Sequence, residues 1–200
     1  MKPAVHGPRH RLVRRRSRSY ASRVVELTVA VSVRLWDEGD ADVLPSLANN
    51  RRIWRNLTNR FPHPYEHRDA VEWIKTANQH PEDARHMAVV ADGTVVGGVG
   101  FERLTDLSTR TAEIGYWIGE PYWGRGIATK ALVAATEIAL GGFDFVRLQA
   151  GVLSWNPASC RVLEKAGYSF EGRLRNQAYK DGEVCDHLMY ARIRESGPPV

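Results

Sequence analysis

A glycine-rich, positively charged turn stands directly before a helical pattern in the middle of the chain. The turn reads Trp123-Gly124-Arg125-Gly126, and the run IATKALVAATEIAL begins at the next residue. The first turn of a helix presents free backbone N–H groups and the positive end of the helix dipole. The glycines let an anion approach the backbone, and the arginine adds charge. The pattern predicts a phosphate site, although two glycines also suit a tight turn without a ligand.

The spacing of this turn excludes two common phosphate-binding loops. A Walker A loop needs the pattern GxxxxGK[ST], which the sequence lacks. A dinucleotide fingerprint needs a third glycine three residues after Gly126, where this chain has Thr129. The strand before the turn also belongs to a hairpin series rather than to a βαβ unit. Another kind of phosphate ligand is therefore expected.

The elements around the turn alternate in a way that predicts an α/β sandwich. Hydrophobic periodicity and turn residues before the turn indicate a strand over 25–36, helices over 37–50 and 66–80, a hairpin over 85–104 that turns at Asp92-Gly93, and a strand over 110–119. The same signals after it indicate a helix over 127–140 ended by Gly141-Gly142, a strand over 145–153, a helix from the Asn156 cap and Pro157 to Gly167, and two strands within 170–193 joined at Asp181-Gly182. The order β-α-α-β-β-β-α-β-α-β-β gives a mixed, largely antiparallel sheet.

Charge is divided unevenly along the 200 residues. Residues 1–23 contain eight basic side chains and no acidic one, so the net charge of +5 becomes −3 for residues 24–200. A mildly acidic body does not indicate nucleic-acid binding. We expect a basic, disordered arm over 1–24, a folded domain over 25–195 and a short tail over 196–200. The arm also fits a targeting peptide, or a start site assigned too early.

The remaining composition is that of an ordinary globular protein. Hydrophobic residues make up 43% of the chain, and no apolar run approaches the roughly 20 residues that span a bilayer. Cys160 and Cys185 form no disulfide framework, and neither their spacing nor that of the histidines suggests a metal. We therefore expect a cytoplasmic protein with no metal and no membrane partner.

Two segments together resemble the GNAT superfamily of N-acetyltransferases. The segments are AEIGYWIGEPYWGRGIATKAL and SWNPASCRVLEKAGYSFEG, and the resemblance covers about 25–193. It is strongest to the branch typified by RimJ and RimL, the ribosomal-protein N-terminal acetyltransferases. The resemblance implies a GNAT fold, with helices on both faces of the sheet and a splayed central strand pair, and an enzyme that uses acetyl-coenzyme A.

The resemblance also implies where acetyl-coenzyme A binds. The backbone from Trp123 to Thr129 would hold the pyrophosphate, and the pantetheine arm would pair with Trp117 and Ile118 where that strand splays from its neighbour near Val152. The implied cofactor residues are Trp117, Ile118, Trp123, Gly124, Arg125, Gly126, Ile127, Ala128, Thr129, Asn156 and Ser159. Many superfamily members have Gln or Arg where this chain has Trp123, but an aromatic residue is common in this branch.

Acetyl transfer needs a neutral amine and a proton for the departing thiolate, but no covalent enzyme intermediate. By resemblance to the Rim-type branch, Ser159 is the candidate proton donor. The tyrosine that many relatives use further along that helix is Leu163 here. Serine is also common in the first turn of a helix without any catalytic role.

Glu113 is the candidate general base, because acidic residues on this strand serve as bases in some relatives. A solvated or salt-bridged glutamate explains it equally well. A second acidic position of the Rim-type branch is Ala178 here, which leaves Asp186 in reserve, as a base or as a brace for its hairpin.

The acceptor expected from the resemblance is a primary amine, either a protein α-amine or a small molecule. Fold alone does not fix that choice, and a monomer and a homodimer remain equally open. The alternative from another class is a non-catalytic acyl-coenzyme A-binding module that keeps the fold.

Overall fold

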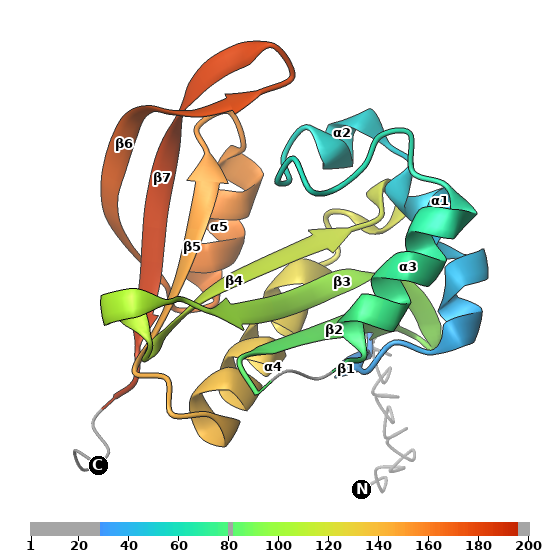
Figure 1. The fold of residues 1–200 in the computed structure, drawn as a ribbon, viewed down its shortest axis with the longest axis horizontal. Helices are drawn as coiled ribbons and strands as arrows, with labels where there is room; N and C mark the ends of the chain where they lie inside the picture. The colour runs from blue at the N-terminus through green and yellow to red at the C-terminus, as the bar shows by residue number, and fades with distance from the viewer. Residues whose placement is uncertain (1–28, 80–81, 196–200) are drawn as a thin grey trace, which may run out of the picture.

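The structure is a computed structural model that describes residues 29–79 and 82–195. Its centre is a seven-stranded sheet with the order β1-β2-β3-β4-β5-β7-β6 (Figure 1). Only β4 and β5 run parallel, and every other neighbouring pair is antiparallel. The strands are β1 (Val31–Arg34), β2 (Ala84–Ala91), β3 (Thr94–Arg103), β4 (Thr111–Ile118), β5 (Arg147–Leu153), β6 (Ser169–Lys180) and β7 (Glu183–Ile193). The mixed, largely antiparallel sheet predicted from the sequence is confirmed.

Helices cover both faces of this sheet, each over its own hydrophobic core. One face carries α4 (Ile127–Gly142) and α5 (Pro157–Lys165), whose core includes the fully buried Phe101, Leu132 and Leu148. The other face carries the 3-10 helix η1 (Glu38–Asp42), α1 (Leu44–Ala48) and α3 (His67–Ala77), which pack around Trp36 and Leu44. The remaining short elements are α2 (Arg51–Trp54), η2 (Asp106–Ser108) and η3 (Glu120–Tyr122).

The turn and cap residues named from the sequence act where they were expected. Positive φ angles occur at Asp92-Gly93 and Asp181-Gly182, which close the β2–β3 and β6–β7 hairpins. Asn156 caps α5 by accepting the N–H of Ser159, and Pro157 is the first helical residue. Gly167, with φ +84°, follows the end of the same helix.

The single helix predicted over 37–50 is wrong. Asp37 does cap a helical segment, but the segment breaks into η1 and α1, and Asn50 then turns extended and caps α2. Asp and Asn side chains compete with the helix for backbone N–H groups, which explains the repeated stops. Because α2 is only four residues long and has no measurable periodicity, the sequence pattern missed it.

Two predicted boundaries also need correction. The helix predicted over 127–140 continues through Gly141 and Gly142, and neither glycine has a positive φ. The helix ends before Phe143, which is its C-cap residue. The Phe143 ring stacks on Phe145 and packs edge-to-face with Phe101. Nearer the N-terminus, the described part of the strand predicted over 25–36 is a strand only over Val31–Arg34, which is β1. The structure does not describe residues 1–28 or 196–200. The predicted arm over 1–24, the predicted tail and the first residues of the predicted strand therefore lie outside the described residues.

The sheet opens between its two central strands. β4 and β5 pair over three residues only, ending with Glu113 opposite Gln149. Both strands continue beyond that pair, β4 to Ile118 along β3 and β5 to Leu153 along β7. Figure 1 shows the two strands diverging, with β5, β6 and β7 turned away from the rest of the sheet. The splayed strand pair implied by the family resemblance is present.

Candidate active site

The glycine turn lies at the end of β4, at the mouth of the opening between β4 and β5. Gly124 and Gly126 have φ angles of +77° and +73°, a conformation that side chains with a Cβ rarely adopt. A Cβ built on either residue would meet no other atom within 4 Å. The turn therefore combines a glycine-dependent backbone with free space beside it.

The start of α4 carries no cap of its own. Gly126 occupies the N-cap position, where it has no side chain to accept a hydrogen bond, and the first turn contains no acidic residue. The Gly126 carbonyl accepts its helical hydrogen bond from the N–H of Lys130 at 3.1 Å, an ordinary length for such a bond. The N–H groups of Ile127, Ala128 and Thr129 thus point out of the helix end, as an anion site requires.

Side chains from the turn fold back against it. The Trp123 indole N–H donates to the carbonyl of Ile118 at 2.6 Å. Arg125 donates to the carbonyl of Pro121 at 3.2 Å and lies over the Tyr122 ring. The turn is thereby attached to the last residue of β4, and it leaves the space above the two glycines open.

Backbone hydrogen bonds alternate along β4 and determine which residues face the opening. The N–H of Gly119 donates to Val96, toward β3, whereas the carbonyl of Arg110 accepts from Val146, toward β5. Since antiparallel ladders alternate residue by residue, Trp117 directs its backbone to β3, while Tyr116 and Ile118 direct theirs into the opening. This register favours the backbone of Tyr116 and the N–H of Ile118 over Trp117 as pairing partners for an extended ligand, since the Ile118 carbonyl already accepts from Trp123.

The hydroxyl of Ser159 lies on the wall of the opening formed by α5. It is 2.8 Å from the phenol oxygen of Tyr116, which is also 3.3 Å from the Ser159 carbonyl. The N–H of Ser159 donates to the side chain of Asn156 at 3.2 Å. Burial raises the pKa of Tyr116 to about 12, against the opposing effect of its hydrogen bond with Ser159. At neutral pH the phenol is therefore protonated.

Tyr116 is the residue of this site that sequence reasoning missed. Alternation along β4 places it with Ala112, Ile114 and Ile118, on the face that packs against α4 and α5. That alternation is readable in the sequence, but a contact with Ser159, 43 positions later, depends on how α5 docks.

Glu113 lies on the opposite face of β4 and does not contact Ser159. It is exposed and stands at the last paired position, between Glu102 of β3 and Gln149 of β5. Glu102 contacts His86 and Arg60 at 3.1 and 3.5 Å. Among the residues that the structure describes, Glu113 forms none of the salt bridges. The two candidate catalytic residues thus approach the opening from different sides.

The helix α2 bridges the mouth of the opening. Near its start, Asn50 donates to Glu120 beside the glycine turn at 2.7 Å, and Arg52 pairs with the same carboxylate. On the other side, Arg51 pairs with Asp181 in the β6–β7 turn at 2.8 Å. Trp155, directly before the α5 cap, donates to Asn56 at 3.2 Å. This bridge joins the strand end at β4 to α5 and to the hairpin.

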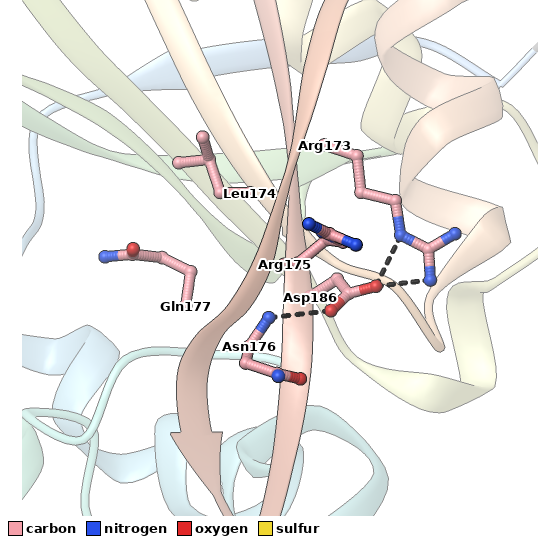
Figure 2. A pocket seen from close by; sticks show the side chains of 6 residues that line it. All are labelled: Arg173, Leu174, Arg175, Asn176, Gln177 and Asp186. Carbon is pink, nitrogen blue, oxygen red and sulfur yellow. Dashed lines mark hydrogen bonds and ion pairs between the residues drawn. The ribbon is translucent and has the colours of Figure 1, made fainter.

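Asp186 braces the β6–β7 hairpin. Its carboxylate accepts the N–H of Asn176 at 2.8 Å and pairs with Arg173, beside a bulge between Leu174 and Ala178 (Figure 2). The Asn176 N–H and the Arg173 guanidinium hold the pKa of Asp186 below its usual range. Of the two roles considered for Asp186, this geometry favours the brace over the base. The open hollow around it is lined by the six residues of Figure 2 and includes none from the glycine turn or α5.

Within the described ranges 29–79 and 82–195, no group of three or more His, Cys, Asp and Glu side chains could hold a metal ion. None of the helices in those ranges is long and apolar enough to cross a membrane.

Comparison with known proteins identifies the family. The profile of the acetyltransferase (GNAT) domain matches residues 31–169, well over half of the chain. The chain belongs to the GNAT acetyltransferase family. The match begins at the first residue of β1 and ends at the first residue of β6, so it includes the glycine turn, the opening and α5.

The relatives of this GNAT protein are N-acetyltransferases. It is 26% identical over 170 residues to the uncharacterized N-acetyltransferase p20 of Bacillus licheniformis, covering 84% of this chain and 94% of the relative. It is 30% identical over 113 residues to the ribosomal-protein-serine acetyltransferase of Escherichia coli, covering 56% and 63%. The activity is acetyl-coenzyme A-dependent acetylation of an amine.

A solved structure supports the fold. The structure of RimL, a ribosomal L7/L12 α-N-protein acetyltransferase in complex with coenzyme A, is 24% identical and superposes with a TM-score of 0.70. The superposition covers 82% of this chain and 93% of RimL. The seven-stranded sheet and its helices therefore form a GNAT fold.

Proposed function

We propose that this GNAT enzyme acetylates a protein α-amine, with acetyl-coenzyme A bound in the opening between β4 and β5. The observation that carries the proposal is the alignment of three features along that opening. The uncapped start of α4 lies at its mouth, the backbone of Tyr116 and the N–H of Ile118 face it from β4, and the Ser159 hydroxyl lies on the α5 wall. Phosphates, pantetheine and thioester sulfur would occupy these three places in that order.

The chemistry assigned to this site is a direct transfer. The neutral amine attacks the thioester carbonyl carbon, a C–N bond forms and the C–S bond breaks. The amine nitrogen loses one proton to Glu113, directly or through water, and the departing sulfur takes one from the Ser159 hydroxyl, which solvent restores. Because Glu113 and Ser159 lie on opposite faces of β4, the amine and the thiol can be served from different sides.

The acceptor preference rests on the charges around α2 and the hairpin. The carboxylates in this region pair with arginines: Glu120 with Arg52, Asp181 with Arg51, Glu183 with Arg55 and Asp186 with Arg173. A polyamine would have to displace an arginine to bind its second ammonium group. A peptide N-terminus brings one reacting amine and no such requirement. A cytoplasmic location agrees with a protein acceptor of this kind.

A thiol-release assay tests the proposal, with peptides of varied N-terminal sequence, spermidine and small amines as acceptors. We expect release with peptides, and kcat/KM for the best peptide at least tenfold above that for spermidine. Ser159→Ala should lower kcat by roughly 10²–10⁴-fold with little change in acetyl-coenzyme A affinity, as expected for loss of a general acid. Ser169→Ala, at an exposed position on β6, is the control.

Two results would contradict parts of this proposal. Acetyl-coenzyme A binding without thiol release for any amine would indicate the non-catalytic module. Wild-type kcat in Ser159→Ala would show that the leaving thiolate takes its proton elsewhere. Glu113→Gln separates the amine side, because it should lower the rate most at pH values where the free amine is protonated.

A further inference from the structure

We propose that Tyr116 is a positioning residue that aims the Ser159 hydroxyl proton at the thioester sulfur. The inference rests on the proposed role of Ser159. It is carried by a contact across the opening, in which a phenol from β4 lies 2.8 Å from the Ser159 oxygen on α5. No other element supplies a side-chain partner to that hydroxyl among the hydrogen bonds of the described residues.

The direction of this hydrogen bond decides whether Ser159 can act. A serine hydroxyl has one proton and two lone pairs. When Tyr116 donates to the Ser159 oxygen, the serine proton has to point elsewhere, and the opening is the side left free. When Ser159 donates to Tyr116 instead, its proton is occupied and cannot reach the sulfur.

Two observations favour donation by Tyr116. The phenol is protonated at neutral pH, because burial raises its pKa to about 12. The Ser159 oxygen at 2.8 Å is also closer to the phenol than the Ser159 carbonyl at 3.3 Å, so the hydroxyl is the better acceptor of its proton. Tyr116 keeps this proton throughout the reaction and acts only through Ser159.

The backbone of Ser159 is fixed from the other side. Its N–H donates to Asn156, at 3.2 Å to the side chain and 3.1 Å to the carbonyl. Two contacts from different elements thus hold the residue, one at its backbone and one at its hydroxyl. Removing the phenol oxygen leaves the Ser159 N–H contact with Asn156 intact, while it removes the 2.8 Å contact with the hydroxyl and the longer 3.3 Å contact with the carbonyl.

The chain offers a matched control in Tyr168. Its phenol is likewise buried, has a pKa raised by burial to about 12, and lies 2.7 Å from a hydroxyl, that of Thr136. This pair lies in the core beside α4 rather than in the opening. Tyr168→Phe therefore removes an equivalent hydrogen bond from a place without a catalytic role.

The test is a double-variant cycle of Tyr116→Phe and Ser159→Ala, measured by thiol release at saturating substrates. We expect Tyr116→Phe to lower kcat roughly tenfold, with the KM for acetyl-coenzyme A changed less than about twofold. In the Ser159→Ala background the same change should have no further effect, because the two residues act as one unit. Tyr168→Phe should leave kcat unchanged in both backgrounds.

A second measurement does not depend on the acceptor. A hydroxyl that donates to sulfur stabilises the thiolate, so the pKa of the bound coenzyme A thiol, followed by thiolate absorption, should be lowest in the wild type. It should rise in Tyr116→Phe, rise in Ser159→Ala and rise no further in the double variant. Tyr168→Phe should match the wild type.

The outcomes separate this inference from the function on which it rests. Equal losses of kcat from Tyr116→Phe in both backgrounds, or an unchanged thiol pKa, would overturn the role of Tyr116 and leave Ser159 in place. A Ser159→Ala variant with wild-type kcat and thiol pKa would overturn both. Failure of coenzyme A to bind would refute the proposed site itself.

Discussion

Single polar side chains determine where several helices of this GNAT protein begin. Asn156 accepts the N–H of Ser159, and Asn50 accepts the N–H of Arg52 at 2.8 Å. Each cap replaces a hydrogen bond that the helix cannot make for itself. At Ser159 the cap has a second effect, because it fixes the backbone of a candidate catalytic residue.

Asp40 is the most heavily bonded of these short polar residues and should make stability depend on pH. Its buried carboxylate accepts from both terminal nitrogens of Arg34, at 2.7 and 2.8 Å, and from the N–H of Asp37 at 2.8 Å. Burial alone would raise the pKa of Asp40, but these hydrogen bonds outweigh it and hold the pKa below the usual value. Asp40→Asn should cost about 1.5–3 kcal/mol of unfolding free energy at pH 7.

The sign of the pH dependence follows from the lowered pKa. The contribution is fully present above the unfolded pKa of about 3.9 and is lost as the pH falls through the lower folded value. Urea unfolding from pH 7 to pH 2 should therefore show the wild type and Asp40→Asn converging in acid. Asp42→Asn is the control, since Asp42 is exposed and its one ion pair with a described residue is with His67. A difference that persists at pH 2 would contradict the prediction.

The cap and the turn of the candidate site were readable from the sequence, whereas contacts between its elements were not. The Asn156 cap and the two glycines of the turn could be predicted because each acts on backbone within a few residues. The contact of Tyr116 with Ser159 joins two elements, so it needs the docking of α5 against β4. Nothing in the local pattern of either segment contains that information.

At the scale of elements, the glycine turn and α4 form one unit whose open space should be sensitive to a side chain. Acetyl-coenzyme A at about 100 times its dissociation constant should stabilise the wild type by about 2.7 kcal/mol. Gly126→Glu should abolish this stabilisation, because it places a carboxylate beside the free N–H groups of α4. Thermal unfolding with and without the ligand measures the effect.

The control for that variant is Gly93→Glu. Gly93 has φ +81°, close to that of Gly126, and a Cβ there also meets no atom within 4 Å. Both variants should lower the melting temperature through backbone strain of about 1–2 kcal/mol. Only Gly126→Glu should lose the ligand-dependent shift, and retention of that shift would move the phosphate site away from the turn.

The bridge made by α2 should depend on its ion pairs with the β6–β7 turn. Asp181 pairs with Arg51 at 2.8 Å and is 3.9 Å from Arg55. Asp181→Asn removes the charge but suits the left-handed φ of 56° at this position. Since these arginines are partly exposed, we expect a loss below about 1 kcal/mol, seen as up to fivefold faster hydrogen exchange over 51–58.

A matched change elsewhere tests whether that effect is local. Asp106 also has a positive φ, of 59°, and lies in η2, away from α2. Asp106→Asn should leave exchange over 51–58 unchanged. Equal exchange in wild type and Asp181→Asn would show that the Trp155–Asn56 contact and Glu120 hold α2 without the ion pairs.

Element types were largely predictable, and the failures have a common cause. Hairpins with Asp-Gly turns and the amphipathic α3 carry strong local signals. The region over 37–56 instead depends on competing Asp and Asn caps and on contacts with Glu120, Asp181 and Trp155, which are far away in the sequence. Tertiary partners, rather than periodicity, decide where α1 ends and α2 begins.

At the scale of the whole molecule, the folded body should not need the basic arm. The first described residues are held by backbone contacts: the Val29 carbonyl accepts from Lys130 and the Ala30 N–H donates to Asp92. Removing residues 1–24 leaves both contacts in place. We expect the truncated protein to keep its melting temperature within about 2 °C and its acetyl-coenzyme A affinity within about twofold. A larger fall in either would show that the arm packs on the body.

The opening between β4 and β5 also bears on how the protein avoids aggregation. Two strand edges with free backbone groups normally invite pairing with another chain, and proteins usually shield such edges at the rim of a sheet. Here the edges face each other inside the sheet, between the α5 wall and the α2 bridge. Edges in this position lie away from the rim of the sheet, where another chain would add a strand. With acetyl-coenzyme A bound at the proposed site, this arrangement would offer hydrogen-bonding backbone to the cofactor while shielding it from other proteins.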